Sequence, residues 1–188
     1  MTRTSIQFDE VIGECRDLFE KKQSDYGASF RVLRTISVVD QILIKVKNLR
    51  NYQLTGISKV GDSEKDNFTA IVNYSVIGLI QLEKGFAEDF EGTKAEIMSM
   101  YDQYTAEAKS LMEKKNHDYG EAWRDMELES ITDLIFQKIL RMKSIHRNNG
   151  LTQASEGLDA NFFDMLNYAV FCLIKISENQ ESSKPKFV

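Results

Sequence analysis

Apolar residues recur at helical spacing along most of this chain. The first run includes Ile6, Val11, Cys15 and Phe19, which lie close to one face when the segment is wound as an α-helix. Only one proline interrupts the 188 residues, and this residue, Pro185, lies close to the C-terminus. Long periodic segments with so few helix breakers predict an all-α protein.

The periodic segments are separated by helix start and stop signals. Ser37, Ser63 and Thr93 are expected N-caps, because their side chains can accept hydrogen bonds from the free N–H groups of a first helical turn. Gly27 and Gly56 are expected to end helices, because glycine tolerates the positive φ of a helix C-terminus. The expected helices span residues 5–22, 37–54, 64–90, 94–115, 130–148 and 155–179.

The second half of the sequence repeats the first half. The motif Glu-Lys-Lys-x-x-Asp-Tyr-Gly occupies residues 20–27 and, 93 positions later, residues 113–120. Further matched pairs are Arg31 and Arg124, Asp40 and Asp133, Lys45 and Lys138, and, after one inserted residue, Asn73 and Asn167. The chain is therefore a tandem duplication, and each copy is expected to contribute three helices.

This duplication predicts how the chain is organised. The first repeat is expected in residues 1–92, the second in residues 93–179, and a disordered tail in residues 180–188. Three helices with broad apolar faces cannot bury them alone, so the repeats are expected to pack about a pseudo-two-fold axis as one globular unit. Such a fused pair replaces a homodimer and predicts a monomer. Recruitment of a second copy through the first or fourth helix is the alternative.

Composition and charge exclude several classes of partner. The net charge is −5 with acidic and basic residues interspersed, so no basic patch predicts binding to duplex nucleic acid or to a membrane. The longest apolar run, Ala169 to Ile174, is too short to span a bilayer, and the N-terminus lacks the apolar segment of a signal peptide. Cys15 and Cys172 are predicted to be packing residues. We expect a cytoplasmic protein.

Acidic residues that could hold a metal are concentrated in the second repeat. Asp164 and Asn167 lie on the very apolar last helix, and Asp133 lies on the helix before it. If these helices pack together, Asp133 and Asp164 face each other, with Glu129 and Asn167 beside them and Glu156 or Asp159 at the mouth. Such an oxygen-ligand set is of the kind that Mg²⁺ uses together with substrate phosphates.

Basic residues near these acids allow two interpretations. Lys138, Arg124 and Arg141 could neutralise phosphate oxygens while a metal stabilises a pyrophosphate under attack by water. Alternatively, Asp133 and Asp164 form interhelical ion pairs with Lys138 and Arg141, as surface helices often do.

The first repeat is poorer in acids. Ala70 stands where the second repeat has Asp164, although Asp40 and Lys45 keep the spacing of their counterparts. We therefore expect the second repeat to carry any metal chemistry, and the first repeat to be its degenerate partner.

The repeated Asp-Tyr-Gly sequence also allows two interpretations. Asp118 and Tyr119, like Asp25 and Tyr26, could bind a nucleoside, with the tyrosine stacked on the base and the aspartate accepting from its edge or from a ribose. Alternatively, Asp-x-Gly is turn chemistry and the tyrosine covers the helix end.

Taken together, these motifs resemble the nucleotide-modification-associated helical domains of phages and bacteria, some of which occur twice in one chain, notably in Bacteroidetes. The resemblance covers residues 19–82 and 112–174. That family is in turn similar to the all-α nucleoside triphosphate pyrophosphatases of the MazG and dimeric dUTPase type, which bind Mg²⁺ through E-x-x-E and E-x-x-D motifs. Those motifs fall on residues 130–133 and 164–167, where two of the four ligand positions differ.

The resemblance implies a MazG-like all-α fold and Mg²⁺-dependent hydrolysis of a nucleoside phosphate. A nucleotide-binding or protein-interaction module that kept the fold without catalysis is the alternative, and a purely structural helical protein is a third. The expected site comprises the metal ligands Asp133, Asp164 and Glu156, the catalytic residues Glu129 and Lys138, and the substrate-binding residues Asp118, Tyr119, Arg124, Arg141 and Asn167.

Overall fold

The computed structural model describes residues 2–59, 61–149 and 157–182, and within them the chain is helical and contains no strand. The first repeat comprises α1 (Arg3–Tyr26), the 3-10 helix η1 (Ser29–Val32), α2 (Thr35–Thr55) and α3 (Glu64–Lys84). The second repeat comprises α4 (Lys94–Tyr119), the 3-10 helix η2 (Ala122–Asp125), α5 (Leu128–Arg147) and α6 (Leu158–Ser182). The prediction of an all-α chain with three helices in each repeat is confirmed.

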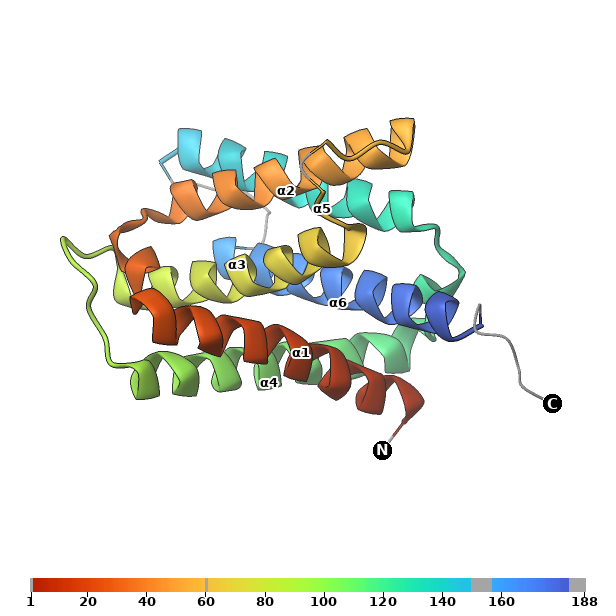
Figure 1. The fold of residues 1–188 in the computed structure, drawn as a ribbon, viewed down its shortest axis with the longest axis horizontal. Helices are drawn as coiled ribbons and strands as arrows, with labels where there is room; N and C mark the ends of the chain where they lie inside the picture. Colours follow the sequence, from red (N-terminus) through yellow and green to blue (C-terminus); the bar gives the residue numbers. More distant parts are fainter. Residues whose placement is uncertain (1, 60, 150–156, 183–188) are drawn as a thin grey trace.

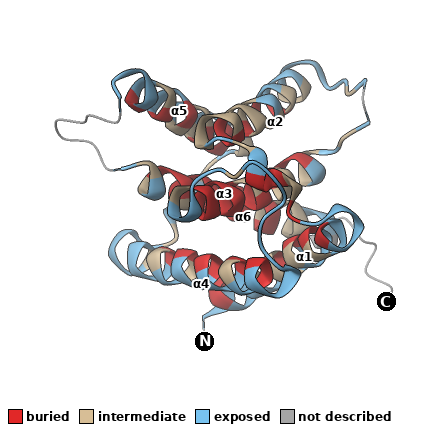
Figure 2. Cartoon of the chain, turned by 90° about the vertical axis from the view of Figure 1, so that its left-hand side faces the viewer, coloured by how far each residue is buried: buried red, intermediate tan, exposed pale blue. Residues whose placement is uncertain are grey.

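The helices form three layers, and each layer contains one helix from each repeat (Figure 1). Helix α1 packs beside α4, α3 beside α6, and α2 beside α5. The middle layer, α3 and α6, carries buried residues along most of its length and separates the two outer layers (Figure 2). Because each layer is shared, the two repeats enclose one common hydrophobic core.

The two middle helices approach each other most tightly at Gly78. A Cβ atom added to Gly78 would lie 2.3 Å from ring carbons of Phe162 on α6. The Phe162 ring is fully buried, so it has no free space into which it could move. Glycine is therefore needed at this position to let α3 and α6 meet.

Capping explains several helix ends. Ser63 and Thr93 each accept a hydrogen bond from the backbone N–H three residues later, and the side chains of Asp66 and Glu96 bond back to the caps. These two reciprocal capping boxes confirm the predicted starts of α3 and α4. Gly27 follows α1 with a φ of 65°, which confirms its predicted role as a helix stop.

Other predicted boundaries are wrong. Ser37 lies inside α2, whose N-cap residue is Arg34. Helices α1 and α4 continue through the Asp-Tyr sequence to Tyr26 and Tyr119. The repeated motif thus forms the last turn of a helix instead of a loop.

The ends of the third and sixth helices also differ from the prediction. Helix α3 stops at Lys84 because Gly85 follows with a φ of 72°, and it does not continue to residue 90. Helix α6 continues to Ser182, so the predicted tail 180–188 begins with helical residues. Residues 183–188 and the predicted helix start at Ser155 lie outside the described residues.

Both cysteines are packing residues, as predicted. Cys15 and Cys172 are buried and unpaired, and burial raises the pKa of the Cys15 thiol to about 12. None of the described helices is both long enough and apolar enough to cross a bilayer.

Repeated buried hydrogen bonds show how the two repeats align in space. The Asn73 side-chain amide donates to the Cys15 carbonyl oxygen at 3.1 Å, and the Asn167 amide donates to the Ala108 carbonyl oxygen at 3.1 Å. Cys15 and Ala108 are 93 positions apart, whereas Asn73 and Asn167 are 94 apart. The structure thus reproduces the one-residue insertion, and it places Asp164 at the position that corresponds to Ala70.

Candidate functional site

Asp164 joins three helices of the second repeat. Its side chain, on α6, is only 10% exposed. The Lys115 Nζ atom of α4 lies 2.5 Å from one carboxylate oxygen, and the Lys138 Nζ atom of α5 lies 2.5 Å from the other. Each oxygen of the carboxylate therefore binds one lysine.

The two lysines keep Asp164 ionised. Burial alone would raise the pKa of this carboxyl group, but hydrogen bonds from Lys115 and Lys138 outweigh burial and lower the pKa below its usual value. A carboxylate whose two oxygens already bind cations is a poor ligand for a metal ion, because the lysines compensate its charge.

Asp133 does not meet Asp164. Its carboxylate lies 3.2 Å from Nε of Arg50 on α2, and its side chain is 62% exposed. The counterpart Asp40 lies 2.6 Å from Nζ of Lys143 on α5. Arg50 and Lys143 are themselves 93 positions apart, so the repeated aspartates form matching ion pairs across the pseudo-two-fold axis. The interhelical ion-pair alternative thus holds for both aspartates: Asp164 has the predicted partner Lys138, whereas the partner of Asp133 is Arg50.

The remaining predicted metal and catalytic residues do not complete a cluster. Glu129 is exposed in the first turn of α5, and Arg141 is exposed on the same helix. Glu156 lies outside the described residues. Within the described part of the chain, no group of three or more His, Cys, Asp or Glu side chains could hold a metal ion. Binding of Mg²⁺ stays a prediction.

Arg124 crosslinks the helices at one end of the second repeat. Its guanidinium group donates to carboxylate oxygens of Glu121 and Glu178 at 2.5 Å and 3.0 Å, and to the side-chain oxygens of Thr4 and Gln7 at 2.6 Å and 2.8 Å. The charge of Arg124 is therefore compensated by the protein itself. In the described structure Arg124 bridges α1, η2 and α6, and its role in phosphate binding stays a prediction.

The other predicted substrate-binding residues are also dispersed. Asp118 pairs with His117 at 3.1 Å on the surface, and Tyr119 is 76% exposed at the end of α4. Asn167 is buried, and its amide is used in the bond to Ala108. Among the predicted residues that the structure describes, Lys138 and Asp164 are brought together, but the set as a whole does not form one site.

A cavity of about 610 Å³ lies in the first repeat, between the C-terminal half of α1, η1, α2 and α3. Its wall combines cationic, amide and aromatic side chains, a mixture that is typical of small-molecule sites. The polar and aromatic lining residues include Lys22, Lys45, Gln23, Gln41, Tyr26 and Tyr74, together with the acidic residues Asp62 and Asp66.

Two cavity lysines correspond to the two that bind Asp164. Lys22 is the counterpart of Lys115, and Lys45 is the counterpart of Lys138. Both lysines line the cavity. The first repeat therefore keeps the same pair of cations on the same pair of helices.

The carboxylate between these lysines is missing in the first repeat. Ala70 forms part of the cavity wall at the position that corresponds to Asp164. Lys45 instead lies 3.2 Å from Asp62, a residue of the loop before α3, and Lys22 forms no ion pair among the described residues. The lining also contains Asp62 and Asp66, so Lys22 is the cationic lining residue without an ion pair among the described residues.

Gln23 adds a buried hydrogen-bond acceptor to the cavity wall. Its side chain is only 6% exposed, and its Oε1 atom has no hydrogen-bond donor in the part of the chain that the structure describes. A buried acceptor without a donor is costly, and a ligand in the cavity could supply one.

Two tyrosines, Tyr26 and Tyr74, line the cavity. Tyr26 is half-exposed, and burial followed by the proximity of Tyr74 raises the pKa of Tyr26. The Tyr74 hydroxyl group lies 3.5 Å from the side-chain oxygen of Gln41. These rings offer aromatic faces beside polar groups, as nucleobase sites do.

Larger side chains fill the corresponding region of the second repeat. Trp123 stacks on Phe171 with ring centroids 4.4 Å apart, whereas the first repeat has Phe30 and Ile77 at these positions. The Asp164 side chain is likewise larger than its counterpart. The smaller residues leave room for the cavity in the first repeat.

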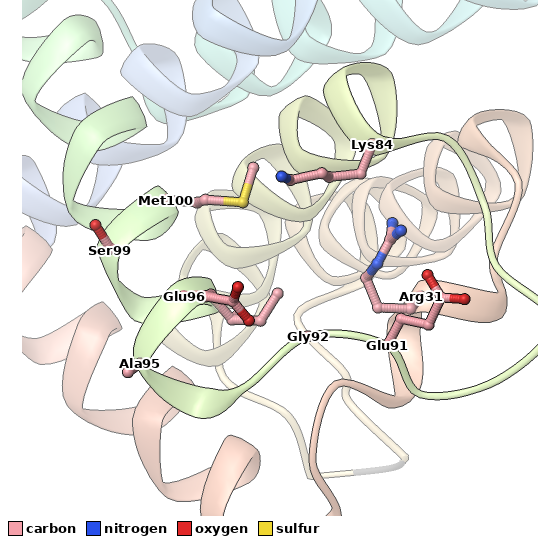
Figure 3. A pocket seen from close by; sticks show the side chains of 9 residues that line it. Arg31, Lys84, Glu91, Gly92, Ala95, Glu96, Ser99 and Met100 are labelled. Carbon is pink, nitrogen blue, oxygen red and sulfur yellow. The ribbon is translucent and has the colours of Figure 1, made fainter.

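A second cavity, of about 630 Å³, lies where η1, the end of α3 and the start of α4 meet. Figure 3 shows Arg31 on the opposite side of this cavity from the first turns of α4. Two of its charged groups already have structural roles, because Arg31 donates to Gln81 and to the Gly85 carbonyl, and Glu96 caps α4 through Thr93. The first-repeat cavity is therefore the stronger candidate.

The sequence did contain a signal for this site. The prediction followed the acidic residues and therefore favoured the second repeat. The informative difference is that Lys22 and Lys45 are retained while Ala70 replaces the aspartate. The pair of cations is retained in the first repeat without the anion that lies between them in the second repeat.

The sequence matches one protein family in both repeats. The family is described as nucleotide modification associated domain 1, and the matched segments are residues 22–82 and 115–176. The chain belongs to this family. Its two nucleotide modification associated domains begin at Lys22 and Lys115 and include the other two lysines, so both lysine pairs lie within family segments. No match was found among curated proteins or among solved structures.

Proposed function

We propose that this chain is a nucleotide-binding module that holds a nucleoside phosphate in the cavity of its first repeat. The observation that carries the proposal is the pair Lys22 and Lys45 in a cavity wall from which Ala70 omits the carboxylate. Lysine ammonium groups are common ligands of phosphate oxygens, because they combine charge with several hydrogen-bond donors.

The remaining lining residues suit a nucleoside. Tyr26 and Tyr74 offer aromatic faces, and Gln23 and Gln41 offer amide groups that can pair with a base or a sugar hydroxyl. The volume of about 610 Å³ falls in the usual range of small-molecule sites, roughly 300–1,000 Å³. The description of the family also supports a nucleotide ligand.

The residues present do not fit the magnesium site of a pyrophosphohydrolase. Asp133 binds Arg50, and Asp164 is shared by Lys115 and Lys138. These two of the expected metal ligands thus already have cationic partners. The proposed function is therefore binding, without a hydrolytic step that passes through a metal ion.

The test is a binding titration of the purified full chain with nucleoside mono- and triphosphates, each with and without Mg²⁺. Ala70→Asp should restore a carboxylate between Lys22 and Lys45 and abolish binding, while Lys45→Met should weaken binding by roughly tenfold or more, since a charged hydrogen bond is lost. Ala106→Asp, the same substitution at an exposed position on α4, is the matched control and should bind like the wild type.

Two outcomes would contradict this proposal. Unchanged binding in Ala70→Asp would place the ligand outside the first-repeat cavity. Turnover of a nucleotide that requires Mg²⁺ and is lost in Asp133→Ala would instead support the hydrolase predicted from the sequence.

A further inference from the structure

We infer that the carboxylate of Asp164 occupies, in the second repeat, the place that an anionic group of the ligand takes in the first repeat. The inference deepens the proposed function and rests on the same cavity. It identifies the part of the ligand that Lys22 and Lys45 recognise, and it assigns a latent anion site to the second repeat.

Contacts that do not involve the lysines show that position 70 in the first repeat corresponds to position 164 in the second repeat. Asn73 and Asn167 lie one helical turn after Ala70 and Asp164, and their amides donate to corresponding backbone carbonyls at the same distance of 3.1 Å. Helix α3 therefore sits on α1 as α6 sits on α4. An anion between Lys22 and Lys45 would occupy the space that corresponds to the Asp164 carboxylate.

The Asp164 contacts describe the anion that this arrangement accepts. Lys115 binds one oxygen and Lys138 binds the other, each at 2.5 Å. The receptor thus presents one ammonium group to each of two oxygens on the same central atom. A terminal phosphate group and a carboxylate both have this pair of oxygens.

The charge of the cavity favours a ligand with a single phosphate group. Lys22 and Lys45 are the cationic lining residues, whereas Asp62 and Asp66 are acidic lining residues. Further phosphate groups would find no additional cations in this lining and would be repelled by the two carboxylates. We therefore assign a nucleoside monophosphate as the preferred ligand class.

A direct consequence concerns the second repeat. Lys138 is only 12% exposed, and its ion pair in the described structure is with Asp164. Removal of the Asp164 carboxylate would leave this buried ammonium group in need of an anion. The second repeat should then bind an external anion, as the first repeat does.

The experiment compares four full-length proteins, with inorganic phosphate as the probe and the binding stoichiometry as the measurement. The wild type should bind one phosphate in the first repeat. Asp164→Ala should bind two, Ala70→Asp should bind none, and the double variant Ala70→Asp/Asp164→Ala should bind one. The double variant has the composition and net charge of the wild type, so it is the matched control for charge.

Lysine substitutions assign each bound phosphate to a repeat. Lys45→Met should weaken phosphate binding by roughly tenfold or more in the wild type, and should leave binding by the double variant unchanged. Lys138→Met should do the reverse. If Asp164→Ala does not fold in sodium chloride, its folding is measured in sodium phosphate at the same ionic strength. Folding in phosphate alone supports the second-repeat anion site, whereas equal folding in both salts counts against that site.

The outcomes separate this inference from the proposed function. If the wild type binds one phosphate but Asp164→Ala binds no second phosphate and the double variant binds none, the inference is overturned and the first-repeat site stands. A gained site together with no binding by the wild type supports the latent site and overturns the proposed function. Tighter binding of adenosine triphosphate than of adenosine monophosphate without Mg²⁺ would overturn the assigned ligand class.

Discussion

In the second repeat, Lys115 and Lys138 hold the Asp164 carboxylate between them, whereas in the first repeat the matching lysines border a cavity. The helices, the repeated motif and the buried asparagine bonds are otherwise alike. The difference teaches that a matching pair of cations can bind a carboxylate of the protein in one copy and border a cavity in the other. The aspartate at position 164 and the alanine at position 70 accompany this difference.

The largest expected effect is the loss of the Asp164 ion pairs. Asp164→Ala should lower the free energy of unfolding by about 3 kcal/mol, because it leaves the buried Lys138 ammonium group without a counter-ion. The value lies at the lower end of the range for broken buried pairs because Lys115 is 54% exposed. Urea unfolding measures the change. A loss below about 0.5 kcal/mol would show that the Asp164 ion pairs do not stabilise the second repeat.

The second expected effect is a difference in acid sensitivity. The pKa of Asp164 is lowered in the folded state, so its ionisation contributes stability above the ordinary carboxyl pKa, and this contribution is lost as the pH falls through the lowered pKa. Between about pH 5 and pH 2 the wild type should therefore lose more stability than Asp164→Asn. Unfolding midpoints across this pH range measure the difference, and parallel curves would contradict it.

A third prediction concerns the layer that the two repeats share. Gly78→Ala should destabilise the protein by about 1–3 kcal/mol, because the new methyl group overlaps the buried Phe162 ring. Gly13, in α1, has no atom within 4 Å of an added Cβ, so Gly13→Ala should stabilise the protein by up to about 1 kcal/mol through helix propensity. Thermal unfolding should therefore give shifts of opposite sign, and equal signs would contradict the tight contact.

The smallest effect tests an asymmetry between the two buried asparagines. The Tyr101 hydroxyl donates to the Asn73 side-chain oxygen at 2.9 Å, whereas the corresponding oxygen of Asn167 has no donor among the described residues. The residue that corresponds to Tyr101 is Phe8. Tyr101→Phe should lower the free energy of unfolding by about 1 kcal/mol. Phe8→Tyr should raise the free energy of unfolding by part of this amount, because the new hydroxyl group can donate to Asn167. Urea unfolding of both variants measures the two changes, and a destabilising Phe8→Tyr would contradict the equivalence of positions 8 and 101.

Much of the fold could be predicted from the sequence because it depends on periodic and local signals. Apolar spacing predicted the helices, the capping residues Ser63 and Thr93 predicted two helix starts, and the repeated motif predicted two copies of one unit. The errors arose where a single residue was given too much weight. Ser37 looked like an N-cap, but the helix begins earlier, at Thr35, without a side-chain cap.

The site could be predicted only in part, because it depends on which helices face each other. Asp133 and Asp164 lie on neighbouring helices, yet Asp133 points toward Arg50 of the other repeat. That partner becomes visible only when α2 and α5 are known to share a layer. The lysine pair was within reach of the sequence, since the comparison of Ala70 with Asp164 needs only the alignment of the repeats.

The bond between Tyr101 and Asn73 has a consequence for how the two repeats depend on each other. Tyr101 belongs to α4 of the second repeat, yet it supports Asn73, which lines the cavity of the first repeat. A protein that ended between α3 and α4 would therefore have a first repeat whose cavity has lost one of its supports. The two repeats are thus interdependent at this point, because a residue of one copy holds a wall residue of the cavity in the other.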